Sequence, residues 1–307
     1  MRERIGLVVA STGYGDRSIE LALAGKPPNG SWWRECLKGT LADELAGILR
    51  LGPKRQVINT ACSSGGIAIA LACDGLRAFD YDVALAVGCD ELAAVTYSGF
   101  HSLRALDPEP CRPFDKNRRG MSIGEGAGCL VLERANDARQ NGKRILGFIA
   151  GSGFACDAHH LTAPDPEGKG AALSMQNALQ QAGVPAKDIG FVNAHGTGTP
   201  LNDTAEIAGI ERAFADHSQR CLVHSVKAST GHCMGAAGTL EAVVAILALE
   251  NQIVPATAGL VDCEFDGHVD CVMGHARGIN ANFGMSNSFG FGGNDATLVF
   301  ERGEAPS

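Results

Sequence analysis

Cys62 lies in the stretch TACSSGG at 60–66, between a short apolar run and a helical pattern. A cysteine in front of a helix faces the positive end of the helix dipole, which favours the thiolate and makes the sulfur nucleophilic. Gly65 and Gly66 allow the backbone to approach a bound group closely. A buried, unreactive thiol is the commoner role of a free cysteine, and we expect it for the other ten cysteines. Cys62 is therefore the candidate nucleophile.

Two histidines occupy similar positions in the second part of the chain. His195 lies in NAHGTGTP, directly after an apolar run, and His232 lies in SVKASTGHCMGAAG, with Lys227 five residues before it. A lone histidine at the end of a strand is often a structural hydrogen-bonding group. These three junctions, however, all lie between a strand and a helix, at the sheet edge where α/β active sites form. A nucleophile with nearby imidazoles suits covalent acyl transfer.

Three more polar residues stand close to these junctions. Thr197 and Thr199 follow His195 and can bind polar groups of a ligand. Glu206 has two interpretations. It completes a capping box with Asp203 at the start of a helix, or it forms an ion pair with Lys227 and so holds a cation near the site.

The stretch NSFGFGGND at 287–295 is a glycine-rich turn between two strand segments. It lacks GxxxxGK[ST] and a following helix, so a nucleotide site is not expected, but its N–H groups could hold an oxyanion. No metal site is expected, because the remaining histidines lack metal-ligand spacing. Those histidines are His101, His159, His160, His217, His224, His268 and His275.

Composition limits the classes of function. The chain has 307 residues with a net charge of −8, from 26 Lys and Arg and 34 Asp and Glu. Nucleic acids and anionic membranes need a basic surface, so neither is expected as the main partner. Eleven cysteines without a CxxC pair suit a reducing cytosol. The N-terminus does not resemble a signal peptide, and no uninterrupted apolar stretch reaches ~18 residues. We expect a soluble cytoplasmic protein.

Strands and helices alternate along the chain, which predicts an α/β fold with parallel sheets. Apolar runs predict strands at 5–10, 56–59, 83–87, 129–132, 145–150, 189–193, 221–226 and 296–300. Helical patterns predict helices at 67–79, 170–181, 204–214 and 238–250.

A diverged internal repeat divides the chain into two similar halves, 1–143 and 144–307. GAGCLVLER resembles GNDATLVFER, RIGLVVASTG resembles DIGFVNAHGTG, and QVINTACSSGG resembles CLVHSVKASTGH. The second half begins with a strand and a helix, at 145–188, that have no counterpart before residue 5. The first half therefore lacks one opening strand and helix.

The motifs together resemble the β-ketoacyl-acyl-carrier-protein synthases of the elongating, Cys-His-His class. They stand in family order over nearly the whole chain as NTACSSG, RPFDKNRRG, GEGAG, NAHGTGTPLND, SVKASTGHCMGAAG and NSFGFGG. The resemblance implies the thiolase fold, with two mixed-sheet halves in an α/β/α/β/α arrangement. It also implies decarboxylative condensation of an acyl thioester with malonyl-acyl carrier protein, in fatty acid or polyketide synthesis, without a cofactor. The partners would be acyl carrier protein and a second subunit, as a homodimer or a heterodimer.

The resemblance also implies a role for each site residue. Cys62 would accept the acyl group, while His195 and His232 would promote malonyl decarboxylation and stabilise the enolate. Lys227 with Glu206 would set the charge around them. The remaining residues would bind the substrate: Phe291 would supply an oxyanion N–H together with Cys62 and act as a gate, and Thr197 and Thr199 would hold the pantetheine arm.

The chain departs from the family pattern in two places. Asn294 and Asp295 follow GFGG where the family usually has Thr-Asn. Family members also begin with a further strand, expected at the centre of its sheet. The alternative function is therefore a non-catalytic or partner-dependent subunit, similar to a chain-length factor. A thiolase acting on CoA esters is a weaker alternative because the second catalytic cysteine is missing, and a metal-binding regulator is weaker still.

Overall fold

The first sheet has the strand order β2-β1-β3-β4 in the computed structural model, which describes residues 2–28, 30–34, 36–37 and 39–304. β1 is parallel to β2 and β3, and β3 is antiparallel to β4. These strands are β1 (Ile5–Ala10), β2 (Arg55–Ile58), β3 (Val83–Asp90) and β4 (Gly126–Glu133).

The second sheet has the order β5-β12-β11-β6-β7-β9. β6 is parallel to β7 and β11, and β12 runs antiparallel to both β11 and β5. Its strands are β5 (Gly147–Cys156), β6 (Ile189–Asn193), β7 (Leu222–His224), β9 (Asp270–Cys271), β11 (Phe283–Gly290) and β12 (Asn294–Arg302); β8 (Ile253–Val254) and β10 (Arg277–Gly278) form a separate ribbon. β5 is longer than the predicted 145–150, because its whole length pairs with β12.

The two sheets confirm the internal repeat. The order β2-β1-β3-β4 corresponds in sequence and direction to β7-β6-β11-β12, and β5 has no counterpart in the first half. Within the described residues no strand pairs with the outer edge of β4, whereas β5 pairs with β12 at the corresponding edge of the second sheet. An opening strand of the first half was expected at the centre of its sheet, but the opening strand of the second half, β5, lies at an edge.

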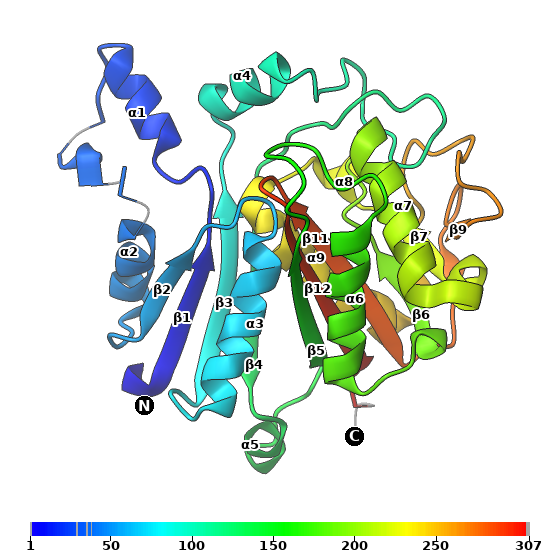
Figure 1. Cartoon of the computed structure of the whole chain (residues 1–307). Coiled ribbons are helices and arrows are strands. Elements are labelled where there is room, and N and C mark those ends of the chain that lie inside the picture. The colour runs from blue at the N-terminus through cyan, green and yellow to red at the C-terminus, as the bar shows by residue number, and fades with distance from the viewer. Residues whose placement is uncertain (1, 29, 35, 38, 305–307) are drawn as a thin grey trace.

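Helices form the layers above, between and below the sheets (Figure 1), which confirms the layered thiolase-like arrangement. α2 packs on the outer face of the first sheet, α3 and α9 lie between the sheets, and α6 packs on the second sheet with α7 beside it. The helices are α1 (Asp16–Leu23), α2 (Thr40–Leu49), α3 (Ser64–Arg77), α4 (Ala94–Ser102), α5 (Ala135–Gln140), α6 (Lys169–Ala182), α7 (Pro200–Phe214), α8 (Lys227–Thr230) and α9 (Ala237–Asn251).

Alternating side chains on the strands divide the core between these layers. In β1, Leu7 and Val9 pack toward α2, whereas Val8 packs into the central layer with α3 and α9. In β12, Phe300 faces the central layer and Val299 faces α6 and α7. This period of two is the signature of strands that are covered on both faces.

The central helices α3 and α9 touch through glycines. A Cβ added to Gly65 would lie 2.7 Å from the backbone nitrogen of Thr239, and one added to Gly238 would lie 2.6 Å from that of Gly66. A side chain at either position would force the helices apart. This close contact fixes the two halves relative to each other at the N-terminal ends of α3 and α9.

Among the described residues, one helical segment, Met234–Asn251, has the length and apolar character to cross a membrane. It contains α9, and 61% of it is buried inside the protein. A buried helix between two sheets passes the same test of length and apolar composition, so this segment is the core helix of the fold.

Asp90, at the end of β3, joins the first sheet to the second half of the chain. Its carboxylate accepts hydrogen bonds from the Ser11 hydroxyl (2.7 Å), the Gly13 N–H (2.8 Å) and both the N–H and the hydroxyl of Thr12. It also accepts one from the Gly235 N–H (2.7 Å), which lies just before α9. Asp90 is buried, so water could not take the place of its carboxylate as the acceptor for these donors.

We therefore expect Asp90→Ala to lower the free energy of unfolding by about 3 kcal/mol or more, because each buried donor left unpaired costs ~1–3 kcal/mol. Asp74→Ala is the control, since Asp74 forms an exposed pair with Arg77 and its loss costs less than ~1 kcal/mol. Urea unfolding followed by circular dichroism measures both. Equal effects of the two substitutions would contradict the role assigned to Asp90.

Candidate active site

The turn that holds Cys62 is fixed by its own serines. The Thr60 N–H donates to Ser64 Oγ (2.8 Å), and the Ser63 hydroxyl donates to the Thr60 carbonyl oxygen (2.7 Å). Ala61 has a φ of 54°, a left-handed conformation that non-glycine residues rarely adopt. The sequence TACSSGG thus forms a tight turn into α3, with Cys62 just before the helix begins.

Phe291 lines the cavity together with Cys62. Burial raises the pKa of the Cys62 thiol to about 11, although the positive charge of Lys227 and the backbone N–H of Phe291 both oppose the rise. Burial therefore opposes the thiolate that the end of the helix is expected to favour. Attack on a thioester must be accompanied by loss of the thiol proton.

His195 is held by the carboxylate of Glu206. Glu206 accepts hydrogen bonds from the backbone N–H groups of His195 (2.8 Å) and Gly196 (2.7 Å) and from Asn287 Nδ2 (3.0 Å). Glu206 is buried, so its carboxylate fixes the turn after β6 rather than facing solvent. The geometry makes Glu206 a positioning residue for His195.

Both sequence interpretations of Glu206 are wrong. The N-cap of α7 is Thr199, followed by Pro200, so Asp203 lies inside the helix and cannot open a capping box. Asp203 instead accepts hydrogen bonds from the N–H groups of Phe114 and Gly198. Lys227 forms its ion pair with a different residue, described next.

Lys227 forms a buried ion pair with Glu241 of α9. Its Nζ also donates to the His195 carbonyl oxygen at 2.5 Å. Burial raises the pKa of Glu241 to about 7, with the positive charge of Lys227 opposing the rise. The sequence analysis did not identify Glu241. Its carboxylate lies well inside the apolar helical pattern at 238–250 and was a signal, because such a charge requires a partner when it is buried.

His232 comes from the second half but is held by the first. Its N–H donates to the Ser122 carbonyl oxygen (2.7 Å), and its carbonyl oxygen accepts from the Gly124 N–H (3.1 Å). The rings of His195 and His232 lie edge to face with their centres 5.2 Å apart. Burial lowers the pKa of both imidazoles well below the usual value, and the charge of Lys227 lowers them further. Both rings are therefore neutral near pH 7 and can each donate one N–H.

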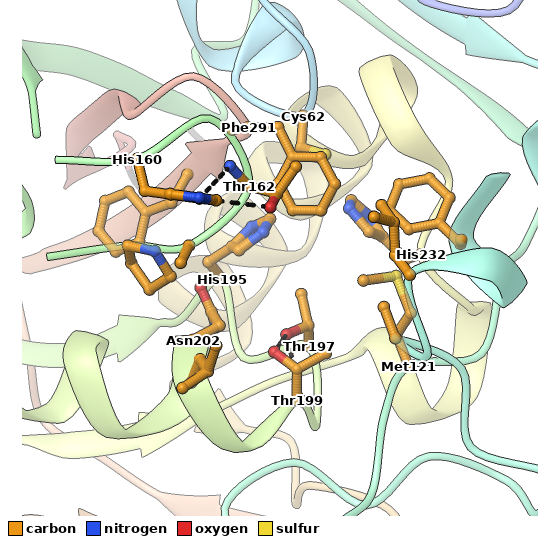
Figure 2. A pocket seen from close by; sticks show the side chains of 18 of the residues that line it. Cys62, Met121, His160, Thr162, His195, Thr197, Thr199, Asn202, His232 and Phe291 are labelled. Atoms are coloured by element: carbon orange, nitrogen blue, oxygen red, sulfur yellow. Dashed lines mark hydrogen bonds between the residues drawn. The ribbon is translucent and has the colours of Figure 1, made fainter. Parts of the chain in front are cut away.

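One cavity of about 330 Å³ is lined by the sulfur-bearing and imidazole side chains and by the substrate-binding candidates, namely Cys62, His195, His232, Phe291, Thr197 and Thr199. Figure 2 shows Cys62 and Phe291 together at one side, His195 and His232 below them, and Thr197 and Thr199 farther along. The hydroxyls of the two threonines lie 2.9 Å apart. Of the site residues predicted from the sequence, only Glu206 and Lys227 do not line this cavity. Both contact it through the backbone: Glu206 accepts from the N–H groups of His195 and Gly196, and Lys227 donates to the His195 carbonyl oxygen.

Several lining residues were not predicted. The loop after β5 contributes His160 and Thr162, Met121 comes from the first half, and Phe100 of α4 packs its ring 5.5 Å from that of Phe291. Their stretches have no recognisable spacing, because the tertiary fold alone places them at the cavity. The arrangement has a nucleophile, an adjacent N–H donor and two neutral imidazoles, which suits acyl transfer.

Comparison with known proteins gives a consistent family. Two family models match, Beta-ketoacyl synthase, N-terminal domain, over residues 2–138, and Beta-ketoacyl synthase, C-terminal domain, over residues 146–261. The 3-oxoacyl-[acyl-carrier-protein] synthase 2 of Vibrio cholerae serotype O1 is 39% identical over 277 residues, which cover 86% of this chain and 67% of the relative. The chain spans about two thirds of the length of the curated relatives it matches.

Solved structures agree. The ishigamide ketosynthase/chain length factor superposes with a TM-score of 0.91 at 33% identity, covering 98% of this chain and 76% of the other. A ketosynthase in complex with its chain length factor from Xenorhabdus doucetiae gives a TM-score of 0.83 at 31% identity, covering 98% and 75%.

Proposed function

We propose that this chain, which belongs to the beta-ketoacyl synthase family, catalyses the decarboxylative condensation of an acyl thioester with malonyl-acyl carrier protein. One observation supports this above the others: Cys62, His195 and His232 line a single cavity, and Phe291, whose backbone N–H favours the charged form of the Cys62 sulfur, lines it with them. Only an acyl acceptor next to donors for two oxyanions needs all four groups.

In the first step, the Cys62 sulfur attacks the carbonyl carbon of the acyl thioester as its proton leaves. The N–H groups of Cys62 and Phe291 stabilise the tetrahedral oxyanion, and one such donor contributes ~3 kcal/mol. The C–S bond to the carrier breaks, and the carrier thiol leaves with a proton. An acyl group now occupies Cys62.

In the second step, the malonyl thioester loses carbon dioxide. The electron pair of the broken C–C bond moves into an enolate, whose oxygen accepts hydrogen bonds from the neutral rings of His195 and His232. The enolate carbon attacks the acyl group on Cys62, and the C–S bond breaks to release a β-ketoacyl thioester. Glu206 and the Lys227–Glu241 pair hold these groups in place.

We propose that both substrates arrive on acyl carrier protein, with Thr197 and Thr199 holding the pantetheine arm. Arg104 and Arg119 also line the cavity and provide positive charge for the phosphate of that arm. We further propose a cytoplasmic protein whose halves are 1–143 and 144–307. It would pair with a second copy or a related synthase, because exposed apolar side chains gather along α4; these are Leu92, Val95, Tyr97 and Leu103.

Intact-protein mass spectrometry tests the acyl-enzyme. After incubation with an acyl-acyl carrier protein, we expect a mass increase of one acyl group, on the peptide that contains Cys62, released by hydroxylamine as a thioester. An unmodified Cys62 in folded protein would support the alternative of a non-catalytic subunit similar to a chain length factor.

A further inference from the structure

A second group of titratable residues lies behind the Phe291 turn. Asp295 is the second residue of β12, after the glycines of that turn, and Asp157 directly follows β5. Both carboxyls line the cavity. Gly170, at the start of α6, lies between them, and a Cβ there would collide with an oxygen of each. The condensation mechanism above uses neither carboxyl.

Asp295 lacks a cation. It is only 4% exposed, and no ion pair involves it among the described residues. One of its oxygens, Oδ2, has no conventional donor within the described residues. Of the two Asp157 oxygens, Oδ2 already accepts a hydrogen bond from the Asp165 N–H at 3.0 Å. Two carboxylates this close repel each other, so a proton held between them is the simplest way to stabilise the arrangement.

The residues around Asp295 reinforce this conclusion. The negative charge of Glu206 comes from α7, and Asp165 lies in the loop before α6. Lys169, at the start of α6, points into solvent and pairs with Glu167. His160 lies in the same loop and contacts Thr162. Burial, then the charge of Asp157, raises the pKa of Asp295 to about 8.

Backbone hydrogen bonds join the two segments that carry Asp157 and Asp295. The Asp157 N–H donates to the Gly293 carbonyl oxygen (3.0 Å), and the Gly292 N–H donates to the Leu161 carbonyl oxygen (2.8 Å). The turn that presents the Phe291 N–H to Cys62 is therefore bound to the loop 157–168. Movement of Asp157 away from Asp295 would loosen the contacts on both sides of the turn.

We propose that Asp157 and Asp295 share one proton, and that this proton positions the Phe291 turn by holding the loop 157–168 against it. When the proton is lost, the two carboxylates repel each other and the turn loosens. Asp295 is thus a positioning residue for the oxyanion N–H, and it makes the site sensitive to alkaline pH. The role in condensation rests on the proposed function, but the shared proton does not.

The stability test follows from the direction of the pKa shift. An acid whose pKa is raised on folding stabilises the protein fully below its unfolded pKa, and that stabilisation is lost as the pH rises toward its folded pKa. Asp295→Asn cannot ionise. The quantity to follow is the folding equilibrium constant of Asp295→Asn divided by that of the wild type. We expect this ratio to rise by up to tenfold per pH unit between pH 5 and 7.5 and to be constant above about pH 8.5. Glu167→Gln, which changes an exposed carboxylate of the same loop, should show no such gain.

The positioning test measures Cys62 directly. Peptide mass spectrometry gives the rate of Cys62 alkylation by iodoacetamide, and the ratio of wild type to Asp295→Asn removes the titration of the thiol itself. We expect a ratio near 1 below pH 7 and a rise of threefold or more through pH 8. The infrared difference spectrum between the wild type and Asp295→Asn cancels the other carboxyls, and it should show a protonated-carboxyl band that disappears over the same pH range.

Two outcomes would overturn the proposal. One is an alkylation ratio that stays flat from pH 6 to 9.5, and the other is a difference spectrum between the wild type and Asp295→Asn without a protonated-carboxyl band. If Asp295→Asn fails to fold, Asp157→Asn provides the same infrared and alkylation tests. A protein that titrates as expected but condenses nothing would refute the proposed function while leaving the shared proton intact.

Discussion

Replacing Cys62 by alanine is expected to reduce condensation by at least ~10⁴-fold, because removal of a catalytic nucleophile leaves only binding and oxyanion stabilisation. The variant should form no acyl adduct. It should retain part of its malonyl decarboxylation, since His195 and His232 remain in the cavity. Radiometric or chromatographic assays of β-ketoacyl product and of carbon dioxide release measure the two steps separately.

Cys129→Ala is the matched control, because Cys129 is an exposed thiol on β4 outside the cavity. It should leave both activities unchanged. If folded Cys62→Ala lost decarboxylation as completely as condensation, the division of roles between the thiol and the two imidazoles would be wrong.

Replacing Lys227 by methionine is expected to lower the free energy of unfolding by ~3–5 kcal/mol, since it leaves the Glu241 charge buried without its partner. Both side chains of the pair are 2% exposed. Loss of Lys227 also removes the charge that lowers the pKa of Glu241, so this pKa rises further. A carboxyl whose pKa is raised by folding makes the protein less stable as the pH rises. The loss of unfolding free energy in Lys227→Met should therefore be larger at pH 8 than at pH 5.5.

Urea unfolding of the double variant Lys227→Met/Glu241→Leu separates the ion pair from general damage. Removing both charges should restore most of the lost stability, because well-packed apolar groups replace a buried pair at little cost. Lys116→Met is the control; its pair with Asp262 is exposed, and its loss should cost less than ~1 kcal/mol. A double variant no more stable than Lys227→Met would show that the pair does not explain the loss.

The sequence predicted the parts of the site that depend on local structure. Cys62 and His195 each follow a strand and precede a helix, and parallel strands bring such turns to one edge. His232 lies beyond β7 as well, but the short helix α8 stands between that strand and the histidine. Their convergence therefore follows from the alternation of strands and helices together with the internal repeat. The repeat likewise predicted the matching strand orders of the two sheets and the unpaired edge of β4.

Contacts between distant segments could not be predicted in the same way. The choice of Glu241 over Glu206 as the partner of Lys227 depends on how α9 packs beside α8, and spacing along one helix carries no information about that. The protonated state of Cys62 depends on its burial, which outweighs the local helix dipole. The length of β5 was underestimated because its glycine-rich end has weak strand propensity, and only pairing with β12 makes it a strand.

The backbone pairing of His232 with Ser122 and Gly124 has a consequence for biosynthesis. A ribosome makes residue 62 early and the Phe291 turn near the end of the described chain. Cys62 of a nascent chain therefore lacks both imidazoles and the Phe291 N–H until most of the described residues have emerged. On the proposed mechanism, an unfinished polypeptide would lack the groups that acylation of Cys62 requires.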